Sequence, residues 1–200
     1  MQRLALFDLD NTLIDLDAAF VSWAEEFAED HGLGQDGVGW LLSLDRNGLP
    51  HRELFFRAVR DQFRLSHPVE DLWAAYRRRM PYLVECRPEV LAGLSELRAE
   101  GWRVGIVTNG MADNQLGKIQ RTGLADVVHG YALSGAEGIR KPDIGLFEIA
   151  AQRCGATLSM GGWMVGDHFI KDIAGGRTAS LRTVWINRTP HRAKSIKLIT

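Results

Sequence analysis

Two aspartates directly after a short apolar run are the first residues of this chain that could do chemistry. Residues 4–7 have the length and composition of a strand buried on both faces, and Asp8 and Asp10 follow at its carboxyl end. Open α/β sheets bind their ligands at that edge. If the chain turns at Leu9, one aspartate can offer its side chain and the other its backbone carbonyl, and such oxygens suit a hard divalent cation such as Mg²⁺. Residues of these types also occur in ordinary strand-to-loop turns.

Residues further along the chain could bind an anion. Thr108 and Asn109 follow a second apolar run at residues 104–107, and a turn of this kind offers a hydroxyl and backbone N–H groups. Lys141 directly precedes a proline that opens a helical pattern. A cation at the start of a helix opposes the helix dipole, so this position is unfavourable unless an anion lies nearby. Each feature alone is also typical of turns and of solvated surfaces.

A second pair of carboxylates follows a third apolar run. Residues 163–165 predict a buried strand, Asp167 stands at its tip, and Asp172 is reached through the following turn. If this strand and the N-terminal strand are neighbours, the acids at positions 8, 10, 167 and 172 could together form a metal cage. The pattern therefore links two distant segments to one candidate site.

The elements that must position these residues alternate between strands and helices. Strands are predicted at residues 4–8, 104–107, 127–133, 163–165 and 183–186. Helical patterns lie between them at residues 88–101 and 143–154, and each is opened by a proline and closed by a glycine. This alternation predicts an α/β fold with a doubly wound, mostly parallel sheet.

Residues 15–86 interrupt the alternation. Their apolar residues recur at helical spacing, as Phe20, Trp23 and Phe27 do, and we expect these aromatic side chains to form a core. Our interpretation is a small helical bundle inserted after the first strand, where it could cover the acidic end of the sheet. The expected domains are an α/β core of residues 1–14 and 87–200 and a helical cap of residues 15–86.

Composition narrows the class of protein. The 200 residues are 46% hydrophobic, which suits one domain with an insertion or two small domains. A formal net charge of −1 indicates neither a nucleic-acid partner nor a membrane partner. The apolar runs are too short to span a membrane, and no signal peptide is recognised, so we expect a cytoplasmic protein. Cys86 and Cys154 form no metal-spaced cluster, and we expect both to be reduced thiols.

Four segments, in this order, resemble the motifs of the haloacid dehalogenase-like hydrolase superfamily. They are residues 7–13 (FDLDNTL), Thr108-Asn109, Lys141-Pro142-Asp143, and Gly166-Asp167 with Asp172. The resemblance covers essentially the whole chain and implies a Rossmann-like core, with the helical insert matching the first-position cap of this superfamily. Within the superfamily, the sequence looks most like the small-metabolite phosphatases.

The resemblance implies chemical roles for the acids. Asp8 would be the nucleophile that forms an aspartyl-phosphate, and Asp10 would protonate the leaving alkoxide and then activate water. The cofactor Mg²⁺ would be held by the side chains of Asp8 and Asp167 and by the backbone carbonyl of Asp10. A cation suits this chemistry because a carboxylate that attacks a phosphate dianion meets charge repulsion.

The other matched residues would hold the phosphoryl group. The resemblance implies that Thr108, Lys141 and backbone amides near Asn109 bind the phosphoryl oxygens, while Asp172 acts through a water or orients Lys141. The expected partner is a small phosphorylated metabolite of the sugar phosphate or nucleotide type. No nucleic acid or membrane is expected as a partner.

Other activities are alternatives to a phosphatase. Asp10 argues against a dehalogenase of the same superfamily, because a leaving halide needs no proton. A phosphomutase shares the same core chemistry and stays an alternative. A phospho-accepting signalling receiver also uses acids, Mg²⁺, a threonine and a lysine on a doubly wound sheet. Its acceptor would lie on a middle strand, however, and it would hold the phosphoryl group without turnover.

Substrate identity depends on the predicted cap. Arg46, His51 and Arg52 lie near a predicted cap turn and could contact an anionic or polar leaving group, although such residues more often form a solvated face. The basic tail at residues 188–200 has no clear periodicity, so docking, disorder and a dimer contact are all open for it. We expect a monomer or a homodimer.

Overall fold

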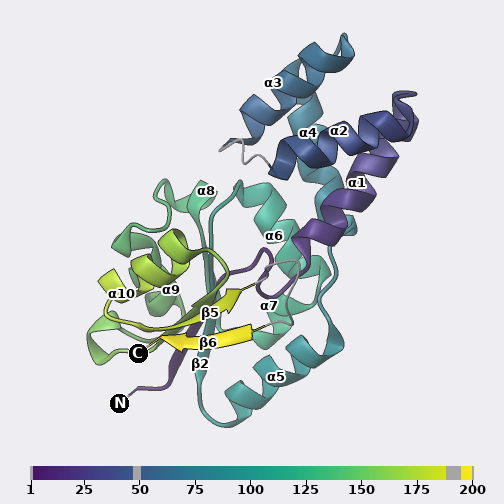
Figure 1. The fold of residues 1–200 in the computed structure, drawn as a ribbon. Helices are drawn as coiled ribbons and strands as arrows, with labels where there is room; N and C mark the ends of the chain where they lie inside the picture. The colour runs from purple at the N-terminus through teal and green to yellow at the C-terminus, as the bar shows by residue number, and fades with distance from the viewer. Residues whose placement is uncertain (1, 47–50, 188–194, 200) are drawn as a thin grey trace. The chain divides into compact units, whose positions relative to one another are not determined.

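A six-stranded sheet with the strand order β3-β2-β1-β4-β5-β6 carries the fold (Figure 1). The computed structural model describes residues 2–46, 51–187 and 195–199. Its strands are β1 (Leu4–Phe7), β2 (Arg103–Thr108), β3 (Gly130–Leu133), β4 (Trp163–Gly166), β5 (Arg182–Asn187) and β6 (Ser195–Ile199). Strands β1 to β5 pair in parallel and β6 pairs antiparallel with β5. The predicted α/β fold with a mostly parallel sheet is confirmed.

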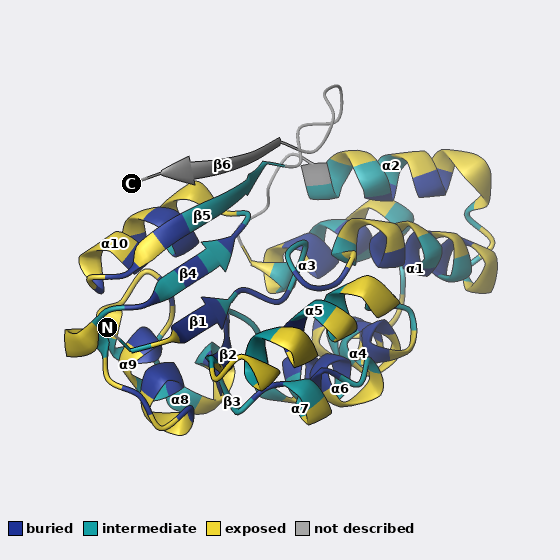
Figure 2. Cartoon of the chain, turned by 90° about the horizontal axis from the view of Figure 1, so that it is seen from below, coloured by how far each residue is buried: buried dark blue, intermediate teal, exposed yellow. Residues whose placement is uncertain are grey.

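Helices cover both sides of this sheet, as a doubly wound fold requires (Figures 1 and 2). On one side lie α5 (Pro88–Ala99), α6 (Ala112–Arg121) and α7 (Leu124–Val127), and on the other lie α9 (Ile144–Arg153) and α10 (Gly175–Thr178). Three short helices follow strand ends or loops: α8 (Ser134–Glu137), η2 (Leu158–Met160) and the π-helix η3 (Phe169–Ala174). In the described parts of the chain, every helix is too short or too polar to cross a membrane.

The chain divides into two compact units. One consists of Met1–Asp15 and Glu85–Thr200 and contains the sheet, and the other is Leu16–Val84. The second unit is helical, with α1 (Leu16–Asp30), α2 (Gly34–Arg46), α3 (Arg52–Phe63), α4 (Val69–Arg79) and the short 3₁₀ helix η1 (Met80–Tyr82). The expected aromatic core is confirmed, since Phe20, Trp23 and Phe27 are all buried there.

Edge-to-face ring contacts build this aromatic core. The rings of Trp23 and Tyr76 lie 5.0 Å apart at 87°, and those of Phe55 and Phe56 lie 5.1 Å apart at 81°. Offset and edge-on pairs of this kind are the preferred aromatic geometry and add to the free energy gained by burial. The core therefore explains why the second unit forms a compact body.

Helix α9 fixes the core of the first unit against the middle of the sheet. Leu146, Phe147, Ala150 and Ala151 are fully buried and belong to one apolar cluster with residues of β1, β2 and β3. Their spacing puts them on one face of the helix, where the small alanines allow close approach to the strands. The side chain of Asp143 caps this helix by accepting from the backbone N–H of Gly145 at 2.9 Å.

Two sequence predictions need correction or completion. The strand predicted at residues 127–133 begins only at Gly130, because Leu124–Val127 form helix α7 after Gly123, whose φ of 76° turns the chain. Val127 is the last residue of this helix, and Val128 and His129 connect it to the strand. In the basic tail, Ser195–Ile199 form strand β6, while residues 188–194 and 200 lie outside the described residues.

The fold makes a testable prediction about α9. Phe147 is fully buried and Ile144 is 41% exposed on the same helix. Phe147→Ala should lower the free energy of unfolding by about 3–5 kcal/mol, since it removes apolar contacts and leaves a cavity. Ile144→Ala, the matched control, should change it by less than about 0.5 kcal/mol. Urea titration followed by circular dichroism measures both, and equal effects would contradict this account of the core.

Candidate active site

The candidate site forms where the order of the strands reverses. Strand β1 lies between β2 and β4, so the chain continues to one side of β1 first and to the other side later. In open α/β sheets, ligands bind outside the carboxyl ends of the strands at such a reversal. Asp8 follows β1 and Asp167 follows β4, and these neighbouring strands bring the two acids to the same edge.

Three carboxylates converge at this edge. Asp8, Asp167 and Asp172 each have an oxygen within 4.8 Å of an oxygen of the others. Gly166 makes part of this approach possible, because a Cβ at that position would collide with the side chain of Asp172. The two acidic segments, far apart in the sequence, therefore meet in one cluster.

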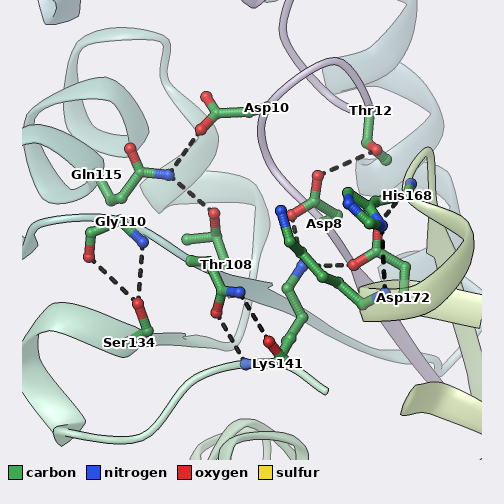
Figure 3. Close-up of polar contacts among 12 residues, drawn as sticks. Asp8, Asp10, Thr12, Thr108, Gly110, Gln115, Ser134, Lys141, His168 and Asp172 are labelled. Carbon is green, nitrogen blue, oxygen red and sulfur yellow. Dashed lines mark hydrogen bonds and ion pairs between the residues drawn. The ribbon is translucent and has the colours of Figure 1, made fainter. Parts of the chain in front are cut away.

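The chain turns immediately after Asp8 and sends Asp10 in another direction. The backbone N–H of Asp8 still donates to Val165 on β4 at 2.9 Å, which extends the pairing of the strands by one residue. Leu9 is then buried, and its carbonyl accepts from Leu13 at 3.0 Å to close a tight turn. As a result, the side chains of Asp8 and Asp10 point to different partners (Figure 3).

A buried lysine joins two of the acids. The ammonium group of Lys141 donates to Oδ1 of Asp8 at 2.6 Å and to Oδ1 of Asp172 at 2.7 Å, and its side chain is only 2% exposed (Figure 3). Burial alone would lower the pKa of Lys141, but the carboxylates of Asp8 and Asp172 outweigh burial and raise this pKa. The two carboxylates therefore favour the charged form of this lysine.

The site carries an excess of negative charge. The pKa of Asp8 is raised to about 7, mainly by burial of the carboxyl group. The carboxylates of Asp172 and Asp10 also raise this pKa, whereas Lys141 lowers it. The acids at positions 8, 10, 167 and 172 contribute four negative charges when ionised, and the buried lysines 118 and 141 contribute two positive ones, so the sum is −2. A divalent cation would balance this charge, and clustered carboxylate oxygens are the ligands that hard cations prefer.

Backbone and side-chain contacts hold Asp172 and Lys141 in place. Oδ2 of Asp172 accepts from the backbone N–H of His168 at 2.9 Å. Asn109 forms two hydrogen bonds with the backbone of Lys141: its Nδ2 donates to the carbonyl at 3.0 Å, and its Oδ1 accepts from the N–H at 2.8 Å. The side chain of Asn109 thus serves to fix the backbone of Lys141.

The loop that follows Thr108, the last residue of β2, is fixed by the first residues of α8. The backbone N–H of Gly110 donates to Oγ of Ser134 at 3.0 Å, and the N–H of Gly135 donates to the carbonyl of Gly110 at 2.9 Å. A Cβ on Gly135 would lie 2.6 Å from that carbonyl oxygen, so only glycine fits. Thr108 itself is 1% exposed, and its hydroxyl oxygen accepts from Nε2 of Gln115 at 2.8 Å.

Several residues at this edge belong to none of the four sequence motifs. Gln115 and Lys118 of α6 both donate to Asp10, and Trp185 of β5 donates from its indole to the carbonyl of Asp167 at 2.9 Å. The sequence signal for the two helix residues is weak, because polar residues inside a helical pattern are usually on its exposed face. Their burial becomes evident only once the helix is packed.

The residues predicted for substrate specificity belong to the second unit. His51 is exposed at the start of α3, and the side chain of Arg46 lies outside the described residues. Arg52 pairs with Asp45, and its guanidinium lies 4.9 Å from the ring centre of Phe20 and 5.2 Å from that of Tyr76. A contact of these three residues with a substrate stays a prediction.

Fold and site together define an α/β enzyme with carboxylates and a buried lysine at the reversal point of its sheet. The chain belongs to the haloacid dehalogenase-like hydrolase family, whose model matches residues 5–186. Its curated relatives support a phosphoric monoester hydrolase.

Three curated relatives illustrate the similarity. A phosphoserine phosphatase of Thermus thermophilus is 36% identical over 143 residues, which are 70% of this chain and 55% of that protein. A glyceraldehyde 3-phosphate phosphatase of Pyrococcus abyssi is 30% identical over 200 residues, with coverage of 92% and 81%. The pyrimidine 5′-nucleotidase YjjG of Escherichia coli is 34% identical over 190 residues, with coverage of 90% and 84%. The chain thus spans about half the length of the first of these proteins.

Solved structures share the fold. A haloacid dehalogenase-like phosphatase from Thermococcus onnurineus has a TM-score of 0.66 and 26% identity, covering 96% of this chain and 89% of that one. The hydrolase YfnB from Bacillus subtilis, bound to magnesium, has a TM-score of 0.76 at 23% identity, with coverage of 97% and 92%. The second likeness bears on the fold alone.

The charge of the site predicts how pH and a cation affect stability. The pKa of Asp8 is higher in the folded chain than its usual 3.8, so the folded state binds more protons between about pH 4 and pH 7. Without a cation, this carboxyl should lower the free energy of unfolding as the pH rises through that window. Millimolar Mg²⁺ should therefore raise Tm more at pH 8 than at pH 5, as scanning fluorimetry can measure.

The control for this experiment is Asp8→Asn, which removes the titrating group. In this variant the Mg²⁺-induced rise in Tm should be smaller, and its difference between pH 8 and pH 5 should shrink. An equal Mg²⁺ effect at both pH values in the unmodified protein would contradict the charge account.

Proposed function

We propose that the protein is a Mg²⁺-dependent phosphatase that hydrolyses a small phosphorylated metabolite through an aspartyl-phosphate on Asp8. The main support is the convergence of Asp8, Asp167 and Asp172, two of which, Asp8 and Asp172, pair with the buried ammonium group of Lys141. Further support comes from relatives that are named phosphatases and nucleotidases. The proposed substrate class is a sugar phosphate, a nucleotide or a metabolite of similar size.

The donor set suits the proposed cofactor. Mg²⁺ would be held by the side chains of Asp8 and Asp167 and by the backbone carbonyl of Asp10, and when bound it would supply positive charge against the phosphoryl oxygens. Asp172 suits a supporting role, since one of its oxygens accepts from Lys141 and the other from the backbone of His168. A neighbouring cation would also favour the carboxylate form of Asp8, which is the form that can attack.

Two side chains and nearby backbone amides would bind the phosphoryl oxygens. Lys141 offers an ammonium group beside the nucleophile, 2.6 Å from Oδ1 of Asp8. The hydroxyl oxygen of Thr108 already accepts a hydrogen bond from Gln115, so its own proton is available to donate to a phosphoryl oxygen. Backbone amides near Asn109 complete the proposed anion site.

The proposed reaction proceeds in two displacements. An oxygen of Asp8 attacks phosphorus while the bond to the leaving oxygen breaks and Asp10 gives that oxygen a proton. Asp10 then takes a proton from a water molecule that attacks phosphorus, which releases phosphate and restores Asp8. A covalent intermediate divides one slow hydrolysis into two easier steps.

Charge and positioning must supply most of the rate enhancement. Phosphate monoesters are among the slowest esters to hydrolyse, with enzymatic accelerations of up to ~10²¹, whereas one positioned acid or base contributes ~10²–10⁴. The remaining barrier reduction must come from the cations and hydrogen-bond donors around the phosphoryl group. This requirement explains why so many charged groups are buried at one edge of the sheet.

A substrate panel tests the proposal. Phosphoserine, glyceraldehyde 3-phosphate, pyrimidine 5′-nucleotides and 4-nitrophenyl phosphate would be assayed for phosphate release with and without Mg²⁺. We expect repeated turnover that requires Mg²⁺, and a loss of kcat by about 10⁴-fold or more in Asp8→Asn, because the nucleophile is gone. Asp126→Asn, which changes an exposed acid on α7, is the control and should keep full activity.

Other outcomes would favour other functions. One bound phosphoryl group per chain without turnover would indicate a phospho-accepting signalling domain. Conversion of a sugar phosphate into its isomer, without free phosphate, would indicate a phosphomutase. Full phosphate release by Asp8→Asn would contradict the assignment of the nucleophile.

A further inference from the structure

Helix α6 buries a polar face that packing alone does not explain. Asn114, Gln115 and Lys118 are only 8%, 1% and 2% exposed, and Lys118 is among the largest fully buried side chains of the described residues. Lysine is almost never fully buried unless it is paired, because removing its charge from water costs free energy. A buried lysine in this position therefore indicates a specific partner.

That partner is Asp10. Nζ of Lys118 donates to Oδ1 of Asp10 at 2.8 Å, and Nε2 of Gln115 donates to Oδ2 at 3.0 Å. Positions 115 and 118 are three residues apart, so the two donors lie on the same face of the helix. Each oxygen of the carboxylate thus has its own donor, and hydrogen bonds to charged groups are the stronger kind.

Gln115 also connects Asp10 with Thr108. An amide nitrogen carries two hydrogens, and Gln115 directs Nε2 at Oδ2 of Asp10 and at Oγ1 of Thr108, the second at 2.8 Å (Figure 3). Gly110 leaves room for this side chain, because a Cβ there would lie 2.8 Å from Cγ and Cδ of Gln115. One side chain therefore holds both the proposed acid and a proposed phosphate-binding hydroxyl.

We propose that Lys118 and Gln115 are positioning residues that hold the carboxyl group of Asp10 for proton transfer to the leaving oxygen. This role rests on the proposed function, which makes Asp10 the proton donor. As the phosphorus–oxygen bond of the substrate breaks and the bond to Asp8 forms, the proton passes from Asp10 to the leaving oxygen. The ammonium of Lys118 and the amide of Gln115 then stabilise the carboxylate that remains.

The leaving group distinguishes this role from a structural one. An alkoxide is a poor leaving group that needs a proton, whereas 4-nitrophenolate leaves without one. The constant kcat/KM reports the steps up to the first irreversible one, which here forms the aspartyl-phosphate and releases the alcohol. The measured quantity is therefore kcat/KM for an alkyl phosphate of the panel divided by kcat/KM for 4-nitrophenyl phosphate.

The main variant is Lys118→Met, which keeps the length of the side chain and removes its charge. We expect kcat/KM for the alkyl phosphate to fall by about 10²-fold, within the range attributed to a positioned acid, and that for 4-nitrophenyl phosphate to fall by less than about 5-fold. The ratio does not depend on the fraction of folded enzyme, so partial unfolding cannot imitate the effect. Gln115→Met should lower the ratio in the same direction.

Controls separate the possible failures. Ile119→Val, on the same helix and equally buried, has no contact with Asp10 among those described and should leave the ratio unchanged. Asp10→Asn should lower the ratio at least as far as Lys118→Met does. If Asp10→Asn lowers the ratio and Lys118→Met does not, the positioning role is wrong and the proposed function stands. If Asp10→Asn leaves the ratio unchanged, the assignment of Asp10 as the acid is wrong.

Discussion

The buried ammonium group of Lys141 between Asp8 and Asp172 is the interaction on which the rest of the site depends. Bringing three charged groups out of water costs free energy, and a well-packed apolar core would often be as stable or more so. Residues of other segments nevertheless hold this triad of Asp8, Lys141 and Asp172 in place. The side chain of Asn109 forms hydrogen bonds with the backbone of Lys141, and the backbone N–H of His168 donates to Asp172. A cost of this kind is understandable where the charges themselves do the chemistry.

Topology makes the triad possible. Asp8 and Asp172 are far apart in the sequence, yet β1 and β4 are neighbours because the strand order reverses between them. The same edge receives the carboxyl end of β2, which carries Thr108, and the segment after β3 and α8, which carries Lys141. Glycines at positions 110, 135 and 166 then permit approaches that a Cβ would block. The sheet thus concentrates in one place what the sequence distributes over most of the chain.

Sequence patterns predicted the parts of the site that follow strand ends. Runs of buried apolar residues identify strands, so the acids after β1 and β4 and the hydroxyl at the end of β2 could be predicted to share an edge. Gln115 and Lys118 could not, since polar residues in a helix are ordinarily solvated and only the packing of α6 buries them. The start of β3 was predicted three residues too early, because Val127 ends the short helix α7 and β3 begins at Gly130. For Arg52, the sequence could not reveal the pairing with Asp45 and the contacts with aromatic rings.

Covalent capture of the acyl phosphate tests the central claim most directly. The enzyme would be mixed with a substrate and Mg²⁺, treated with borohydride, which reduces an aspartyl-phosphate to homoserine, and mapped by peptide mass spectrometry. We expect homoserine at position 8 only when substrate is present, and none in Asp8→Asn. Phosphate release with an unmodified Asp8, or capture at a different residue, would contradict it.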